Sequence, residues 1–545
     1  MARTSLARQL RSLAAEHRAA QELGWTPQQV HESGADVVRT ELGRRGFLKG
    51  ALGVAGLAAL SSAGVALPAA AAGSRIAVVG AGIAGLSAAL RLQDSGVAST
   101  VYEAGSRVGG RMYSNTTSWE AGQVSEWGGE LIDSGHKTVQ ALVRRFGLRL
   151  DDLLQAEPNG AEPTYFFDGR YYPYAEATKD FQQVHNAIQA DMQSFTWPIT
   201  WNSSNAAGRA LSNLSLHDWI ATRVAGGHSS RMGQLLDVAY NIEFGGETTD
   251  QTALNLLGLL GYKPNPGNFA MFGLSDERYH IRGGNQQLPN AMAAALPSGS
   301  VKLGQRLTAV VANSDGTQTL TFATATGTSR VTVDHTVLAL PLGVLQRLDL
   351  SRAGLDDRKT RQIASMRMGK NAKLQLQFNR RTWNSTGPWP GIASGETYSD
   401  LGYQNSWDVT RGQSGDQGIL LQYTGGDTAG SFTPATPFND QSSSYVRSVA
   451  RAFLGQVEQV LPGVSAQWNG RATLSAWPTN PLSYGAYSYW PVGYAHQYAG
   501  YEGVRQGNLH FAGEHCSIDF QGYMEGGAVE GQRAAREVLD DLGVK

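Results

Sequence analysis

A glycine turn between a short β-branched run and a small-residue helix is the feature that most restricts the fold of this chain. The run covers residues 76–79, the turn reads Gly80-Ala81-Gly82-Ile83-Ala84-Gly85, and a helix is expected over residues 86–95. A second expected strand over residues 99–102 ends at Glu103. A carboxylate about 20 residues beyond such glycines can accept hydrogen bonds from a ribose. Together these elements predict a Rossmann-like dinucleotide-binding domain.

The residues of the turn have separate physical roles. Gly80 allows the tight turn, Gly82 lets the backbone approach a pyrophosphate, and Gly85 permits close packing of the helix on the strand. Ile83 and Ala84 lie where the positive end of the helix favours a phosphate. All five are therefore expected at the nucleotide.

Composition narrows the class of partner. The chain has 545 residues with 45 Lys and Arg against 46 Asp and Glu, so its net charge of −1 argues against nucleic acid. With 41% hydrophobic residues it can bury the cores of several domains. The single cysteine, Cys516, excludes internal disulfides and multi-cysteine metal sites, and we predict no metal site. We expect Cys516 to be a small packed residue.

Paired arginines precede an apolar segment near the start of the chain. Arg44 and Arg45 are followed by Phe-Leu-Lys and by an apolar run of small residues over 51–67. The pattern resembles a twin-arginine export signal with cleavage near Ala72. The alternative is a membrane-anchoring helix, but the run is shorter than the roughly 20 residues that a span needs. The resemblance implies export of the folded, cofactor-loaded protein by the twin-arginine translocase, to the periplasm or the cell exterior.

The residues that follow Glu103 indicate whether the expected dinucleotide is NAD or FAD. Two arginines there bracket two glycines, an arrangement that can line a diphosphate and let the backbone pass close to an isoalloxazine ring. The residues concerned are Glu103, Ala104, Arg107, Gly109, Gly110 and Arg111. At this point the sequence resembles the flavin-containing amine oxidases, which comprise monoamine oxidases, polyamine oxidases and L-amino-acid oxidases. The resemblance implies FAD as the cofactor.

The resemblance covers residues 74–543, and its motifs occur in the family's order. Gly128, Gly129 and Glu130 resemble a second glycine motif that passes near the flavin ring. Residues 279–284 resemble the segment that leads back from the substrate domain into the flavin domain.

A β-hairpin is expected over residues 301–322, with Asp315-Gly316 at its turn. In the family this hairpin touches adenine through a valine, and either Leu307 or Val310 takes that place here. Residues 337–341 are then another buried strand of the same domain.

Lys373 is the expected catalytic lysine. It opens an alternating strand that we expect to continue to Trp383, and it matches the family lysine that holds a water against flavin N5. The alternative is that Lys373 is an ordinary surface residue, as most lysines are. Lys370, three residues earlier, is a second candidate for the catalytic lysine.

The longest motif stands near the C-terminus, before an expected helix. Its residues expected at the flavin are Gly513, Glu514, Gly522, Tyr523 and Met524. The resemblance implies that the helix N-terminus directs its positive end at flavin N1 and the C2 carbonyl. It also places Glu514 near the ribityl chain or pyrophosphate and the Met524 backbone amide at the ring.

The chain departs from the family at three places. Gly485 occupies the position of the cysteine that tethers flavin in monoamine oxidases, so FAD is expected to bind without a covalent link. Ala486 replaces one wall of the two-tyrosine cage, so only Tyr523 remains as a catalytic cage residue, although Tyr487 or Trp490 could supply aromatic surface towards substrate.

The third departure concerns the substrate carboxylate. Leu131 occupies the place of the arginine that binds this carboxylate in vertebrate-type L-amino-acid oxidases, although another arginine such as Arg282 could serve. Glu130 could hold a second positive charge on a diamine, a polyamine or a basic amino acid, or it could be a solvated surface residue.

The fold class expected from the resemblance is α/β plus α+β, a Rossmann-like FAD-binding domain with an interleaved substrate domain. The predicted limits are 1–72 for the extension and signal, 73–144, 281–379 and 481–545 for the FAD-binding domain, and 145–280 and 380–480 for the substrate domain.

The resemblance implies oxidation of an amine by hydride transfer to flavin N5. The products are an imine, which water hydrolyses to an aldehyde and ammonia, and hydrogen peroxide formed from molecular oxygen. An L-amino-acid oxidase that yields a 2-keto acid is the alternative on the same scaffold. Readings from other classes are a flavin electron-transfer or desaturase-like protein and a non-catalytic binding module. The resemblance also admits a homodimer.

Overall fold

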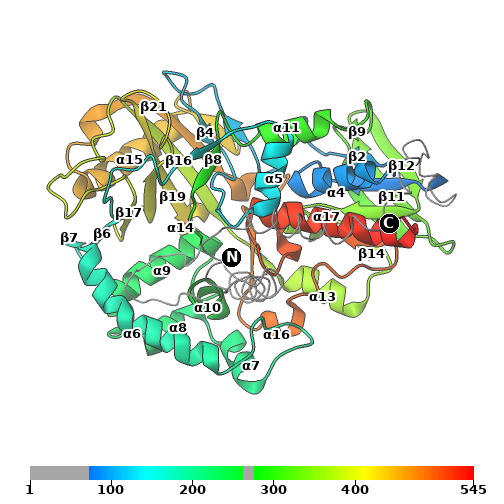
Figure 1. Ribbon diagram of the computed structural model, residues 1–545, viewed down its shortest axis with the longest axis horizontal. Helices are drawn as coiled ribbons and strands as arrows, with labels where there is room; N and C mark the ends of the chain where they lie inside the picture. Colours follow the sequence, from blue (N-terminus) through cyan, green and yellow to red (C-terminus); the bar gives the residue numbers. More distant parts are fainter. Residues whose placement is uncertain (1–72, 262–274, 545) are drawn as a thin grey trace, which may run out of the picture.

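The computed structural model describes residues 73–261 and 275–544, so the predicted export signal lies outside the described residues (Figure 1). A five-stranded parallel sheet is its first layer. In spatial order the strands are β23 (Leu509–Phe511), β13 (His335–Leu338), β1 (Ile76–Val79), β2 (Thr100–Tyr102) and β9 (Val301–Lys302). Segments far apart in sequence therefore share one sheet. The strand expected over residues 337–341 is present as β13, but it starts two residues earlier and ends at Leu338.

Small residues let helices pack closely on this sheet. The helices beside it are α4 (Ile83–Asp94), α5 (Lys137–Arg145), α11 (Gln287–Ala294) and α17 (Met524–Asp541). Helices α4 and α17 lie side by side (Figure 1). A Cβ atom at Gly531 would come within 2.0 Å of the Ala84 carbonyl oxygen, so only glycine allows the two helices this close.

The predicted hairpin is present but starts later than expected. It consists of β10 (Arg306–Ala312) and β11 (Gln318–Thr324), which pair antiparallel around Gly316, whose φ is +84°. Strands β12 (Gly327–Val333) and β14 (Asp349–Arg352) complete a four-stranded sheet. Residues 301–302 form β9 of the parallel sheet instead, because they pair with β2.

An eight-stranded sheet forms the second large layer. In spatial order its strands are β20 (Phe438–Asp440), β21 (Trp468–Ala476), β16 (Asn371–Phe378), β19 (Gly418–Gly425), β18 (Asn405–Asp408), β17 (Thr397–Ser399), β6 (Thr164–Phe167) and β7 (Arg170–Tyr172). The sequence-based limits group β16 with the FAD-binding segments, whereas its pairing with β19 and β21 places it in this sheet. The domain limits themselves remain predictions.

Strand β16 shows the expected alternation but ends at Phe378 rather than at Trp383. Leu374 and Phe378 pack in the core cluster that includes residues of α15 (Ser444–Val460). On the other face, Gln375 donates a hydrogen bond of 2.8 Å to the Glu126 carbonyl. Because both faces are covered, all eight residues are buried.

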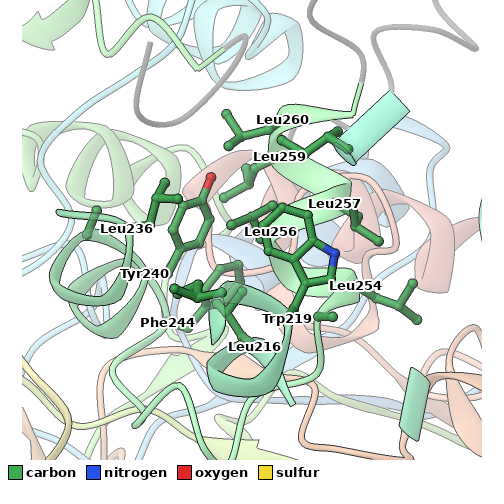
Figure 2. Packing of buried hydrophobic residues seen from close by; sticks show 14 of the residues in the cluster. Leu216, Trp219, Leu236, Tyr240, Phe244, Leu254, Leu256, Leu257, Leu259 and Leu260 are labelled. Carbon is green, nitrogen blue, oxygen red and sulfur yellow. The ribbon is translucent and has the colours of Figure 1, made fainter. Parts of the chain in front are cut away.

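A helical layer packs through α9 (Arg231–Phe244) against strands β19, β18, β17 and β6 of this sheet. It also contains α6 (Tyr174–Gln193), α7 (Ala206–Asn213), α8 (Leu216–Arg223) and α10 (Leu254–Leu260). Trp219, Tyr240, Phe244 and the leucines of α10 form its core (Figure 2). Ser230 caps α9 by accepting a hydrogen bond from Gly233 N, and Gly245 ends the helix with φ +66°. The C-terminus of α9 is thereby fixed beside the cavity described below.

Short elements connect these layers. They are β3 (Ser114–Asn115), β4 (Ser125–Glu126), β5 (Leu150–Asp152), β8 (Tyr279–Ile281), α12 (Leu342–Leu345), α13 (Asp357–Ser365), β15 (Arg367–Met368), α14 (Gly426–Gly430), β22 (Ser488–Tyr489) and α16 (Ala495–Tyr498). Strand β5 pairs with β8, so the chain enters and leaves the helical layer at one place. No helix in the described ranges is long and apolar enough to cross a membrane.

Candidate active site

A cavity of about 600 Å³ lies beside the carboxyl ends of β1 and β2. The glycine turn lines one part, here called the nucleotide half, as expected for a ligand at the carboxyl end of a parallel sheet. Aromatic and acidic side chains and one lysine line the other part, here called the substrate half. They are Glu130, Glu243, Phe244, Glu277, Lys373, Trp407, Tyr423, Tyr487 and Tyr523.

The glycine turn leaves room for a ligand where the sequence predicts it. Gly80 has φ +103°, and a Cβ atom there would lie 2.4 Å from the Ala339 carbonyl oxygen. A Cβ atom at Gly82 would meet nothing within 4 Å, and this residue caps α4 without a side-chain hydrogen bond. The first amides of α4, near Ile83 and Ala84, are therefore available to a diphosphate.

Gly85 serves packing instead of lining the cavity. A Cβ atom there would lie 1.9 Å from the Gly80 carbonyl oxygen, so the helix could not approach the strand with any larger residue. This is the packing role expected from the turn, but it places Gly85 behind the site rather than in contact with the cofactor.

Glu103 is oriented by two backbone amides at the cavity wall. Its carboxylate accepts hydrogen bonds from Ala81 N at 2.8 Å and from Gly105 N at 2.7 Å. Leu307 lines the cavity, whereas Val310 is buried in the core beneath the hairpin and does not. Of the two candidates for the adenine contact, only Leu307 therefore lies at the cavity, and the contact itself stays a prediction.

The two arginines of the second segment have different surroundings. Arg107 donates to the Gly110 carbonyl at 2.6 Å and lies over the Tyr113 ring, and burial lowers its pKa. Arg111 donates to the Ala486 carbonyl at 2.6 Å and to Glu514 Oε1 at 2.9 Å. Arg111 therefore joins three segments that are far apart in sequence.

Glu514 completes this network beneath the C-terminal glycine motif. Its Oε2 atom accepts hydrogen bonds from Gly522 N at 2.9 Å and from the Ser488 hydroxyl at 2.8 Å. Burial raises the pKa of Glu514, but the Arg111 guanidinium, His515 and the Ser488 hydroxyl together outweigh burial and hold the pKa below its ordinary value. The carboxylate is thus an ionised, structural part of the cofactor wall.

Helix α17 directs its N-terminus at the cavity. Tyr523 is its N-cap residue and makes no side-chain capping bond, and Met524 begins the helix. A Cβ atom at Gly129 would lie 3.2 Å from Met524 Sδ, so the second glycine motif and α17 meet closely at the cavity wall. The positive end of α17 therefore faces the cavity.

Lys373 forms a buried ion pair with Glu130. Lys373 Nζ lies 2.6 Å from Glu130 Oε2, and their side chains are only 8% and 7% exposed. Trp407 Nε1 donates to the other carboxylate oxygen at 2.9 Å. Burial raises the pKa of Glu130, but the Lys373 ammonium, with smaller contributions from Trp407 and His280, holds this pKa below its ordinary value. Lys373 is therefore not a surface lysine, and Glu130 is not a solvated surface glutamate. The competing residue, Lys370, is exposed and pairs with Asp427.

Two residues proposed for the substrate site lie elsewhere. Trp490 is buried in the core of the helical layer, where it packs near Tyr494, and it does not line the cavity. Arg282 is exposed and pairs with Asp151, so it cannot meet a substrate carboxylate in the cavity. Tyr487 does line the cavity, and its hydroxyl lies 2.8 Å from that of Tyr423.

The sequence pattern of the flavin containing amine oxidoreductases matches residues 83–539. The chain belongs to this family. The enzyme is 25% identical to an L-amino-acid oxidase of Mus musculus over 86% of this chain and 71% of that one. It is 27% identical to a nicotine dehydrogenase of Pseudomonas putida over 85% and 88%. Its fold is similar to that of cyclohexylamine oxidase from Brevibacterium oxydans, with a TM-score of 0.73 at 21% identity over 86% of this chain and 99% of that one.

Family membership confirms the predicted fold class, cofactor and enzyme class. The protein is an FAD-dependent oxidoreductase that oxidises the carbon–nitrogen bond of amines. The residues fit the cofactor, because the open space at Gly82, the oriented carboxylate of Glu103 and the uncapped N-terminus of α17 line one continuous cavity. Cys516, the single cysteine of the chain, is buried outside the cavity wall, and burial raises the pKa of its thiol.

Sequence reasoning missed two carboxylates in the cavity wall. Glu243 lies in the last turn of α9, one residue before its end at Phe244, and Glu277 stands two residues before β8. Neither carries a local signal, because Glu243 is part of an ordinary amphipathic helix and Glu277 of a loop. The one sequence signal that could have indicated Glu277 as a site residue is its position two residues before the motif at residues 279–284.

Proposed function

We propose that this amine oxidase acts on amines that carry no carboxylate beside the reacting nitrogen, rather than on L-amino acids. The observation that carries the proposal is the charge of the substrate half. Its carboxylates are Glu130, Glu243 and Glu277, and its one cation among the described residues, Lys373, is held by Glu130. Leu131, which lines the same wall, offers no donor to a carboxylate.

The cavity arginines lie with the nucleotide half. Arg107 and Arg111 follow the glycine turn, Arg306 precedes Leu307 in the hairpin, and Arg347 stacks on Tyr484 at 3.9 Å. A substrate carboxylate would therefore enter a wall of other carboxyl groups, without the planar fork that binds such groups well.

The protein's own residues favour a neutral reacting amine. When bound, FAD supplies the acceptor for the hydride that leaves the carbon beside the nitrogen. Tyr423, Tyr487 and Tyr523 present aromatic surface, and burial raises the pKa of each hydroxyl, so these walls stay uncharged. Desolvation between such walls disfavours the ammonium form. Lys373 has two further N–H donors with which to orient a water, the positioning role we propose for it.

The test compares matched substrates under nitrogen. The absorbance of oxidised flavin at about 450 nm is followed after mixing with 2-phenylethylamine or L-phenylalanine, and with 3-methylbutylamine or L-leucine. We expect each amine to bleach the flavin with an efficiency at least about ten-fold above that of its amino acid. Faster bleaching by the amino acids would reject the proposal and support the alternative hypothesis of an L-amino-acid oxidase. Several relatives of this chain are named L-amino-acid oxidases.

We propose molecular oxygen as the final electron acceptor and hydrogen peroxide as its product, supported by the similarity to relatives that are named oxidases. A peroxidase-coupled dye added on admitting air tests this, and the proposal fails if the bleached flavin persists in air.

A homodimer, which the resemblance admits, stays a prediction that light scattering tests.

We propose export through the twin-arginine translocase, supported by the sequence pattern alone. Replacing both Arg44 and Arg45 by lysine should leave the protein inside the cell, whereas the unchanged chain should be recovered outside the cytoplasm in folded, yellow form. Equal export of both forms would contradict it.

A further inference from the structure

Two carboxylates of the substrate half form no ion pair with any lysine, arginine or histidine of residues 73–261 and 275–544. Tyr523 donates a hydrogen bond of 3.3 Å to Glu243 Oε1. No side chain in the described ranges donates a hydrogen bond to the Glu277 carboxylate, although the backbone N–H of Glu277 donates to Asp133 Oδ1 at 3.0 Å. Both side chains line the cavity. Glu130, the third carboxylate, differs because Lys373 neutralises it.

These carboxylates are in an unfavourable electrostatic environment. Burial raises the pKa of Glu243 to about 7 and the pKa of Glu277 well above its ordinary value. The carboxylates of Asp133, Glu243 and Glu396 raise the pKa of Glu277 further, and only Arg411 opposes them. Arg411 is itself engaged by Glu157. A cation delivered into the cavity would relieve this repulsion.

The backbone at Glu277 shows that its position is enforced. Its φ is +45°, in the left-handed region that costs a residue with a side chain about 1 kcal/mol or more. Strain of this kind persists where the surrounding structure holds a side chain in place. Here the backbone hydrogen bond to Asp133 holds it, and the side chain is directed at the cavity.

We propose that Glu277 and Glu243 bind a second, positively charged group of the substrate. The preferred substrates are then diamines or polyamines, in which one nitrogen reacts as the neutral amine and the distant one stays an ammonium. This inference rests on the proposed function. It transfers to these two residues the role that the sequence suggested for Glu130, whose carboxylate is already paired.

The test uses two amines of equal size. 1,4-Diaminobutane and n-pentylamine have the same number of heavy atoms, and a methyl group replaces the second ammonium in the latter. Anaerobic stopped-flow mixing gives the limiting rate of flavin bleaching and the half-saturating concentration for each. We expect the diamine to half-saturate at a concentration at least about ten-fold lower, which corresponds to about 1.4 kcal/mol.

Variants separate binding from folding. Glu277→Gln and Glu243→Gln should each raise the half-saturating concentration of the diamine about ten-fold or more and leave that of pentylamine within about two-fold. Asp357→Asn removes the same charge from an exposed site on α13 and should change neither. FAD content and the thermal midpoint of each variant report its folding.

The outcomes distinguish the two proposals. Equal half-saturation by both amines, or equal loss for both in Glu277→Gln, would overturn the second-cation site while amine oxidation stands. Bleaching by L-amino acids but by no amine would overturn the proposed function, and this inference with it.

Discussion

The ion pair between Lys373 and Glu130 allows a quantitative prediction. Its atoms lie 2.6 Å apart, and both side chains are almost fully buried. At an effective dielectric constant of about 20, Coulomb's law gives about 6 kcal/mol of attraction, part of which offsets desolvation. Lys373→Met leaves Glu130 buried without its counter-charge. Such a loss costs about 3–5 kcal/mol, and because the Trp407 hydrogen bond remains, we expect the lower value.

The assay is a double-mutant cycle on the purified, FAD-loaded protein. Thermal unfolding followed by tryptophan fluorescence should give Lys373→Met the lowest midpoint. The double variant, which carries both Lys373→Met and Glu130→Gln, should have a midpoint between that of Lys373→Met and that of the wild type. The second change removes the stranded charge and keeps the acceptor for Trp407. Lys370→Met, at an exposed pair, should unfold like the wild type. A double variant no more stable than Lys373→Met would refute the argument from stranded charge.

The remaining predictions concern the cofactor wall, the helices and pH. Arg111→Met should lower the FAD content of the purified protein at least about ten-fold, since it removes bonds to two distant segments; full FAD content would contradict this. Gly85→Ala should prevent soluble folding, because the new Cβ atom would overlap the Gly80 carbonyl, whereas Gly455→Ala, with open space on α15, should raise the thermal midpoint slightly. The half-saturating concentration of 1,4-diaminobutane should fall as pH rises through about 7, where Glu243 loses its proton, and Glu243→Gln should flatten this dependence.

Local patterns were enough for the nucleotide half. The glycine turn, the acidic strand end and the C-terminal motif act through backbone geometry, which depends on residues that are neighbours in sequence. Their structural positions could therefore be predicted, including the packing role of Gly85. Family and cofactor follow from the same motifs.

The substrate half could not be predicted in this way, since its chemistry depends on which distant elements meet. Lys373 and Glu130 are 243 residues apart, and only the packing of β16 against the second glycine motif made them a pair. Contacts between other distant elements likewise buried Trp490 in the helical core, left Arg282 at the surface and placed Glu243 and Glu277 at the cavity.

The sequence by itself therefore determined the fold class, the family and the flavin site, because backbone requirements are written in short runs of glycine and small residues. The tertiary structure alone decided which carboxylates are neutralised and which line the cavity without an ion pair to any described side chain. The physical reason is that the charge state and partner of a buried side chain depend on burial and on neighbours from other elements, which no local pattern records.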